Sequence, residues 1–272
     1  MAKHLINGCE SSHISVLDRG LLYGDGLFET IWVHEGNPYY WATHLQRLWR
    51  GSDILALPKF GKQILETEIA QVCQKQSGIL KIIITRGESE RGYQLPHITN
   101  PTRIISFFPD VNPLADKNKF LQIKARICKV RLSPQPFLAG IKHLNRLEHI
   151  MARSEWRDDQ IGEGILLTYN DHVISGTMTN LFFTKDNKVY TPKIVECGVR
   201  GIAREQIITY CHQQQISCEE VEVSLQQLLN ADEIFLCNSI KGILAITEIE
   251  GYNHQFTTHF THRFLKQALV FC

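Results

Sequence analysis

The stretch that says most about this chain is Leu138-Ala139-Gly140-Ile141-Lys142-His143-Leu144-Asn145. It places one lysine in an apolar, glycine-containing segment directly before the expected start of a helix. Lysine avoids such settings, because burying an ammonium group is costly. Partial desolvation lowers the pKa of a lysine and frees its amine to form an imine with a carbonyl group. Lys142 is therefore a candidate nucleophile, although a lysine that buries its stem and keeps its charge in solvent explains the same residues.

On both sides of this stretch, apolar residues alternate between strand and helix spacing. Before it, the pattern predicts strands over 3–7, 27–34, 80–85 and 103–108, and helices over 41–55 and 63–74. After it, the pattern predicts strands over 121–130, 164–169, 181–183, 233–237 and 243–248, and helices over 145–156, 202–214 and 257–270. Asn145 and Glu148 have the spacing of a capping box at the start of the helix over 145–156.

The pattern lapses into proline, asparagine and aspartate over 109–116, which is typical of a linker. We therefore predict an N-terminal α/β domain over 1–109, a linker over 110–118 and a C-terminal α/β domain over 119–272. The mixture of strands and helices predicts a mixed sheet with flanking helices in each domain.

Composition excludes several classes of function. Lys and Arg number 29 against 28 Asp and Glu, so no basic surface is expected for nucleic acid. The N-terminus has no apolar stretch long enough for a signal peptide, and no run of residues approaches a membrane span. The eight cysteines form no C-x-x-C pair, which favours reduced thiols and a cytoplasmic location.

Most catalytic signatures are missing, including G-x-G-x-x-G, the Walker A loop, H-E-x-x-H and G-x-S-x-G. The twelve histidines show no metal-ligand spacing, so no metal site is expected. Three places suit a phosphate group instead. Gly201 precedes the predicted helix over 202–214, Asn238-Ser239 follows a predicted strand, and Arg47 lies inside a predicted helix. Each of the three is an ordinary feature when taken alone.

Five ordered blocks of sequence together resemble the class IV aminotransferase family, the fold-type IV pyridoxal-phosphate enzymes. The resemblance runs from residue 7 to about residue 246. The blocks are Asp18-Arg19-Gly20, Tyr23 to Thr30, His44 to Leu48, Gly140 to Glu148 and Thr179 to Phe182.

The resemblance implies a two-domain α+β subunit that binds pyridoxal 5'-phosphate in the cleft between its domains, mainly on the C-terminal domain, and that forms a homodimer. It makes Lys142 the lysine that forms the Schiff base with the cofactor. The residues that it assigns to the phosphate group are Arg47, Ile202 and Ala203 through their amides, Asn238 and Ser239.

Within the family, this chain is most similar to the aminodeoxychorismate lyases, which release pyruvate from 4-amino-4-deoxychorismate and form 4-aminobenzoate for folate. The similarity lies in the segments 28–30, 85–93 and 140–148. It implies that Thr30 assists proton transfer. It also implies substrate contacts from Tyr23, Arg91 and Tyr93. A D-amino-acid or branched-chain aminotransferase is the nearest alternative, and a non-catalytic member that only binds the cofactor is another.

Two positions depart from the family pattern. Ser175 stands five residues before Asn180, where the family places a glutamate that pairs with the pyridine nitrogen of the cofactor. A hydroxyl cannot stabilise a protonated pyridine as a carboxylate does, so a weaker electron sink is expected. Ala203 stands where aminotransferases often have threonine, so a hydroxyl contact to the phosphate is lost while the backbone N–H remains. Lyases whose product becomes aromatic need the strong sink less than aminotransferases do.

Overall fold

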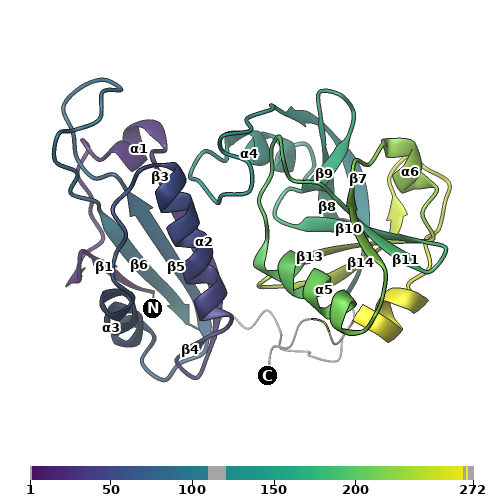
Figure 1. Ribbon diagram of the computed structural model, residues 1–272, viewed down its shortest axis with the longest axis horizontal. Helices are drawn as coiled ribbons and strands as arrows, with labels where there is room; N and C mark the ends of the chain where they lie inside the picture. Colours follow the sequence, from purple (N-terminus) through teal and green to yellow (C-terminus); the bar gives the residue numbers. More distant parts are fainter. Residues whose placement is uncertain (1, 110–120, 266–267, 269–272) are drawn as a thin grey trace. The chain divides into compact units, whose positions relative to one another are not determined.

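The computed structural model describes residues 2–109, 121–265 and 268, and these residues form two compact units (Figure 1). Unit 1 takes the described part of Met1–Pro113 together with Ile141–Asn145. Unit 2 takes the described part of Leu114–Gly140 and of Arg146–Cys272. The chain thus leaves unit 2 at Gly140 and returns to it at Arg146. The predicted linker over 110–118 lies outside the described residues.

Unit 1 is built on a six-stranded sheet with the strand order β2-β1-β6-β5-β3-β4. All of its strand pairs are antiparallel, so the mixed sheet predicted for this half is wrong. The reason is that a helical connection between two strands is compatible with either direction of pairing, and here β3 and β5 pair antiparallel across α2 and α3. The strands are β1 (Lys3–Ile6), β2 (Cys9–Glu10), β3 (Gly26–His34), β4 (Asn37–Pro38), β5 (Gly78–Thr85) and β6 (Arg103–Pro109), and the helices are α1 (Arg19–Tyr23), α2 (Trp41–Ile54) and α3 (Lys62–Cys73).

The core of unit 1 lies between the sheet and its helices. Along β3, alternate residues face α2, because successive side chains of a strand point to opposite faces. Leu45 and Leu48 of α2 are buried, and so are Leu65 and Ile69 of α3, which packs on β6 and β1. This packing fixes α2 against β3, which positions the charged residues described below.

Unit 2 is built on an eight-stranded sheet with the order β12-β11-β10-β13-β14-β7-β8-β9. An additional pairing between β9 and β10 closes six of these strands into a ring. The pairs β7–β8, β7–β14 and β11–β12 are parallel, and the other pairs are antiparallel, so a mixed sheet is confirmed for this half. The strands are β7 (Leu121–Leu132), β8 (Ile161–Thr168), β9 (Val173–Gly176), β10 (Asn180–Lys185), β11 (Lys188–Pro192), β12 (Cys218–Val221), β13 (Glu233–Asn238) and β14 (Gly242–Ile249).

Two apolar clusters pack on opposite faces of these strands. Leu181 and Ile234 lie in one cluster, while Phe182 and Phe235, the next residues along each strand, lie in the other. The second cluster also takes Ile207 of α5, so this helix covers the Phe182 face of the sheet. The rings of Phe182 and Phe235 stack at 5.0 Å. The helices of unit 2 are α4 (Leu147–Arg153), α5 (Ile202–Gln213), α6 (Leu225–Leu229) and a π-helix over Thr261–Leu265.

The capping box predicted from Asn145 and Glu148 is wrong. Helix α4 begins at Leu147, and its N-cap residue, Arg146, makes no side-chain capping bond. Asn145 donates to the carbonyl of Gly24, and Glu148 accepts from the backbone N–H of Ser133 at 3.0 Å. Both side chains are hydrogen-bonded to residues distant in the sequence, so they do not cap α4.

The other predicted helices correspond to α2, α3 and α5, with ends that differ by at most one residue. The helix predicted over 257–270 is a π-helix over Thr261–Leu265, and part of that range lies outside the described residues. No helix in the described ranges is long and apolar enough to cross a membrane.

Candidate active site

Lys142 lies in unit 1, on a short segment that runs beside the first residues of β3. The N–H of Phe28 donates to the carbonyl of Lys142 at 2.9 Å, and the N–H of Leu144 donates to the carbonyl of Gly26 at 3.0 Å. Leu27 and His143 pair in the same antiparallel bridge. These bonds fix the backbone of the candidate nucleophile on the edge of the sheet.

The amine of Lys142 lies over the aromatic ring of Phe28, with 4.3 Å between Nζ and the ring centroid. The side chain is half-buried, and the π-face of an aromatic ring attracts an ammonium group. Thr30 lies two residues further along β3, so its side chain is on the same face of the strand as Phe28. The structure therefore brings the two predicted catalytic residues, Lys142 and Thr30, to one region of unit 1.

Arg47 forms a buried ionic cluster with Glu29 and His44. Arg47 donates from Nε and Nη2 to the two carboxylate oxygens of Glu29 at 2.8 and 2.5 Å. His44 Nδ1 lies 2.6 Å from Glu29 Oε2. The family resemblance implies a phosphate contact for Arg47, but it gave no indication of Glu29 or His44. The only sequence signal was the three-residue spacing of His44 and Arg47, which puts both on one face of a helix.

The charge states in this cluster follow from its burial. Desolvation alone would raise the pKa of Glu29, but the charges of Arg47 and His44 and the hydrogen bonds from both residues lower it to about 2. Burial lowers the pKa of His44, with only partial compensation from Glu29. The Nδ1–H of His44 donates to the ionised carboxylate of Glu29. This arrangement holds the guanidinium of Arg47 in one orientation.

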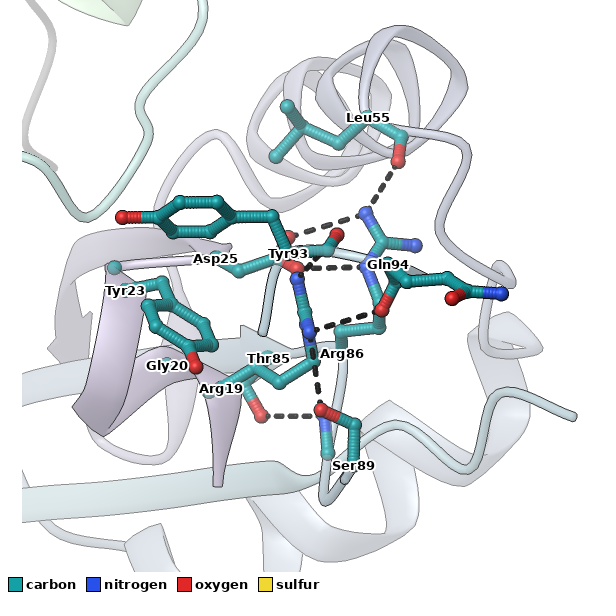
Figure 2. Close-up of polar contacts among 12 residues, drawn as sticks. Arg19, Gly20, Tyr23, Asp25, Leu55, Thr85, Arg86, Ser89, Tyr93 and Gln94 are labelled. Atoms are coloured by element: carbon teal, nitrogen blue, oxygen red, sulfur yellow. Dashed lines mark hydrogen bonds and ion pairs between the residues drawn. The ribbon is translucent and has the colours of Figure 1, made fainter. Parts of the chain in front are cut away.

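The loop over 88–94, which carries Arg91 and Tyr93, is anchored to α1 by Arg19 (Figure 2). The guanidinium of Arg19 is buried and donates to Ser89 Oγ at 3.0 Å and to the carbonyls of Gly92 and Gln94 at 3.0 and 3.3 Å. Its Nε donates to Asp25 at 2.9 Å. Arg86 donates to the same carboxylate at 2.7 Å, and burial of Asp25 is outweighed by the two arginines, which keep its pKa below the ordinary value. Arg19 and Asp25 were missed as anchors by sequence analysis.

The three predicted substrate residues lie on this loop and on α1. The backbone N–H of Gly92 donates to the Tyr23 hydroxyl at 3.3 Å, and the rings of Tyr23 and Tyr93 are 5.3 Å apart. Tyr93 is 82% exposed, and Arg91 is also exposed. The structure thus brings Tyr23 and Tyr93 together and leaves Arg91 and Tyr93 accessible to a ligand.

In unit 2, Asn180 connects the three segments to which cofactor contacts were assigned. On the sheet it pairs with Ser175 of β9 and with Cys237 of β13. Its Nδ2 donates to the carbonyl of Val199 at 2.9 Å. Its Oδ1 lies so close to Gly201 that a Cβ atom there would come within 2.0 Å of it. Asn180 therefore fixes Ser175, the start of α5 and the end of β13 relative to one another, a role that sequence analysis did not assign.

The start of α5 has the geometry of an anion site. Gly201 is its N-cap residue, and Glu205 donates the first helical hydrogen bond to the Gly201 carbonyl at 3.1 Å. The N–H groups of Ile202 and Ala203 precede that bond, where a helix carries a partial positive charge. Both side chains are buried, which holds this first turn in place. The backbone here suits a phosphate group.

Asn238 supports a turn with its side chain. Its Oδ1 accepts from the N–H groups of Ile240 and Lys241 at 2.9 and 2.6 Å, and its Nδ2 donates to the carbonyl of Met178 at 3.4 Å. Ser239 is half-buried on the same turn. Asn238 therefore shapes the backbone that carries Ser239.

Ser175 is buried on β9, and the nearby carboxylate of Glu163 does not replace the missing glutamate. Glu163 is buried as well, and its oxygens accept from the hydroxyls of Thr177 and Thr179. They also accept from the backbone N–H groups of Gly164, Thr177 and Met178. Glu163 thus stabilises the turn between β9 and β10, and position 175 offers a hydroxyl only.

The family described as "Amino-transferase class IV" matches residues 26–249, which is most of the chain. This chain belongs to that family. An aminodeoxychorismate lyase of Vibrio harveyi is 33% identical over 248 residues, covering 90% of this chain and 91% of the relative. A D-alanine aminotransferase of Bacillus licheniformis is 26% identical, covering 88% of this chain and 83% of the relative.

A solved structure agrees with this assignment. The crystal structure of 4-amino-4-deoxychorismate lyase from Pseudomonas aeruginosa has a TM-score of 0.88 and 35% identity to this chain, covering 97% of each. The predicted family and the α+β fold of fold-type IV enzymes are thereby confirmed. Pyridoxal phosphate is the cofactor of this family. Taken separately, unit 1 offers a half-buried lysine amine of the kind that forms an imine with a carbonyl group, and unit 2 offers helix amides of the kind that bind a phosphate. Position 175 offers a hydroxyl and no carboxylate.

Proposed function

We propose that this protein is an aminodeoxychorismate lyase, which eliminates pyruvate from 4-amino-4-deoxychorismate and yields 4-aminobenzoate for folate biosynthesis. The main support is the similarity to two lyases, of Vibrio harveyi and Pseudomonas aeruginosa, over at least nine tenths of the chain at 33% and 35% identity. The residues of both units supply groups suited to that reaction.

Pyridoxal phosphate, when bound, supplies an electron sink for the carbon that bears the substrate amine. Lys142 holds the cofactor through its amine, and the same amine, once released by the substrate, removes the proton from that carbon. Thr30, on the Phe28 face of β3, relays a proton to the oxygen of the leaving enolpyruvyl group. Such positioned acid–base groups contribute on the order of 10²–10⁴-fold each.

The remaining residues bind and orient. Arg47, oriented by Glu29, and the amides of Ile202 and Ala203 bind the phosphate, together with the turn that carries Asn238 and Ser239. The substrate is a dicarboxylate, so a positive charge is needed near it. Arg91 supplies that charge from the anchored loop, and Tyr23 and Tyr93 supply hydroxyl groups.

Ser175 favours the lyase over an aminotransferase. Transamination depends on a protonated pyridine nitrogen, and a serine hydroxyl cannot hold that proton as a carboxylate does. Loss of pyruvate from aminodeoxychorismate makes the ring aromatic, so a weaker sink is sufficient for the lyase reaction.

The decisive experiment compares Lys142→Ala with Lys81→Ala. Both lysines lie over the ring of Phe28, with Nζ at 4.3 Å for Lys142 and 5.7 Å for Lys81. The purified proteins are examined by absorbance and are then given enzymatically generated aminodeoxychorismate. Lys142→Ala is expected to lose the absorbance band of the lysine-bound cofactor and to release pyruvate on the order of 10⁴-fold more slowly, or not at all. Lys81→Ala is expected to keep the band.

Other outcomes would redirect the proposal. If the wild type binds the cofactor and transfers amino groups to 2-oxo acids without releasing pyruvate, it is an aminotransferase. Bound cofactor with turnover of no candidate amine would indicate a non-catalytic member. A protein that binds no pyridoxal phosphate would contradict the assignment of Lys142.

We further propose a homodimer located in the cytoplasm. Leu21 and Leu22 of α1 are 60% and 45% exposed, and Val16 and Leu17 beside them are 74% and 52% exposed. Contiguous exposed apolar residues favour a protein–protein contact. Light scattering after gel filtration should give twice the mass of the chain, and a monomer at micromolar concentration would contradict this part of the proposal.

A further inference from the structure

Two cysteines in unit 2 lie side by side, and neither is one of the predicted cofactor residues. Cys211 is on the last turns of α5, and Cys218 is the first residue of β12. Their side chains are hydrogen-bonded to one another. Both belong to the apolar cluster beneath α5, Cys211 fully buried and Cys218 at its edge. Their sulfur atoms are therefore in van der Waals range.

The backbone between them is held in place. The N–H of Ile216 donates to the carbonyl of Cys211 at 2.8 Å, directly after the end of α5. The N–H of Val189 donates to the carbonyl of Ser217 at 2.9 Å, and Val189 is also the strand partner of Cys218 on β11. The two thiols thus lie at the ends of a short turn whose backbone is held by hydrogen bonds, and they pack on the same apolar cluster.

The two thiols differ in their environment. Cys218 is half-buried and reaches solvent, whereas Cys211 is fully buried. The hydrogen bond from Cys211 lowers the pKa of Cys218, burial opposes this, the positive charge of Arg204 lowers it further, and the carboxylates of Glu220 and Glu219 raise it. The hydrogen bond to Cys218 and burial both raise the pKa of Cys211. Cys218 is therefore the thiol that ionises and reacts with an oxidant first, and Cys211 is placed to react with the oxidised Cys218.

We propose that Cys211 and Cys218 form a redox modification site, which closes reversibly to a disulfide under hydrogen peroxide. The Cys218 thiolate attacks peroxide, so that a sulfur–oxygen bond forms, the oxygen–oxygen bond breaks, and hydroxide leaves and takes up a proton as water. The sulfur of Cys211 then attacks the sulfur of Cys218, displaces the oxygen as a second water molecule and gives up its proton. In sum, two thiols and one peroxide give one disulfide and two waters. A dithiol reductant reverses the change.

The bond would tie the end of α5 to β12. The same helix begins with the amides of Ile202 and Ala203. A cross-link over this short loop restricts the unfolded chain, so the oxidised protein is expected to melt about 3–8 °C higher than the reduced protein.

Peptide mapping of the holoenzyme tests the proposal without any assay of turnover, so its result is independent of the lyase assignment. The protein is treated with peroxide, alkylated, and cleaved after glutamate. Cleavage after Glu205 and Glu219 gives the peptide 206–219, which contains Cys211 and Cys218 and no other cysteine. In the oxidised wild type this peptide should contain the internal disulfide, so its mass should be lower by two hydrogens and it should carry no alkyl group. After reduction it should carry two.

Three variants complete the test. In Cys211→Ala and in Cys218→Ser, oxidation should leave no internal disulfide in this peptide and no rise in melting temperature. Cys9→Ser removes an exposed thiol of unit 1 and should behave like the wild type. If the wild-type peptide takes two alkyl groups after peroxide, or if Cys218 oxidises to the sulfinic acid with Cys211 still alkylatable, the proposal is wrong. Because the wild type alone decides these outcomes, a variant that fails to fold leaves the test intact.

Discussion

Unit 1 fixes its candidate cofactor residues with buried charges, whereas unit 2 fixes its own with neutral hydrogen bonds. In unit 1, Arg47 is oriented by the ionised carboxylate of Glu29, which is 1% exposed. In unit 2, the amides at the start of α5 are positioned by the amide side chain of Asn180 and by the closeness of Gly201. Removing one partner in unit 1 leaves an uncompensated charge, while a change in unit 2 acts through shape. The two regions should therefore fail in different ways.

The largest effect is expected from Glu29→Gln. The substitution keeps the size of the side chain but leaves the buried guanidinium of Arg47 without a counter-charge. Breaking a buried ion pair from one side costs about 3–5 kcal/mol. Urea unfolding at pH 7 measures this loss. Asp53→Asn is the control, because it breaks an exposed pair with Lys59, and it should change stability by about 0–1 kcal/mol. Equal effects of the two substitutions would contradict a special role for the buried cluster.

The pH dependence of stability sharpens the same comparison. Glu29 has an ordinary pKa of 4.5 and a pKa of about 2 in the folded protein. A carboxyl group with a depressed pKa stabilises the fold above its unfolded pKa and loses that contribution as the pH falls. The wild type should therefore lose about 3 kcal/mol from this group between about pH 4.5 and pH 2. The unfolding free energy of Glu29→Gln should fall less steeply over that window, and an unchanged slope would contradict the assignment.

The contrast between the units also shows what the sequence could reveal. Strands such as β3 and β5 were predictable, because their apolar runs have strand spacing and length. The short strands β9, β11 and β12 and the helices α1 and α6 were not predicted, because a few residues hold too little periodicity. The excursion of Ile141–Asn145 into unit 1 has no sequence signal either, since it depends on pairing with β3.

The residues of the candidate site also divide into those that the sequence indicates and those that it does not. Lys142 and the start of α5 were predictable, because local chemistry and ordered motifs mark them. The bond between Glu29 and Arg47 was not, because 18 residues separate them and only the packing of α2 on β3 joins them. Glu163 gave no signal, since its partners come from a turn more than ten residues later. Sequence motifs thus mark candidate chemical groups better than the partners that orient them.

A smaller effect is expected from Gly201→Ala in unit 2. The added Cβ would lie 2.0 Å from Asn180 Oδ1, so Asn180 must move and its bond to Val199 weakens. We expect a loss of about 10–100-fold in affinity for pyridoxal phosphate, measured by titration of the cofactor-free protein. Affinity for pyridoxal, which lacks the phosphate, should change less.

Gly61→Ala is the matched control for this substitution. Gly61 is the N-cap residue of α3 with φ −61° and ψ 142°, close to the −72° and 145° of Gly201. Nothing lies within 4 Å of a Cβ placed at Gly61. The two substitutions thus restrict the backbone in the same way, but only Gly201→Ala brings the new Cβ atom into contact with a neighbour, Asn180. Equal affinities in the two variants would show that the closeness of Asn180 and Gly201 has no bearing on the cofactor.

The smallest effect concerns Ser175, where a missing charge distinguishes this chain from the family pattern. Ser175→Glu restores a carboxylate, and Ser175→Gln has the same size without the charge. If the weaker electron sink suits a lyase, the glutamate variant should transfer amino groups from D-alanine or leucine about 10-fold faster than the glutamine variant. Their rates of pyruvate release from aminodeoxychorismate should be similar, because formation of an aromatic ring drives that step.

Melting temperatures of both variants separate this electronic effect from the cost of placing a larger side chain at a buried position. Both variants add nearly the same volume, so a shared loss of stability reflects packing, and only the difference between them reflects charge. The absorbance of the bound cofactor should depend on pH differently in the two proteins, because a carboxylate favours the protonated pyridine nitrogen. If Ser175→Glu leaves both the spectrum and the amino-transfer rate as they are in Ser175→Gln, position 175 does not act on the pyridine nitrogen. The serine would then be no reason to prefer a lyase over an aminotransferase.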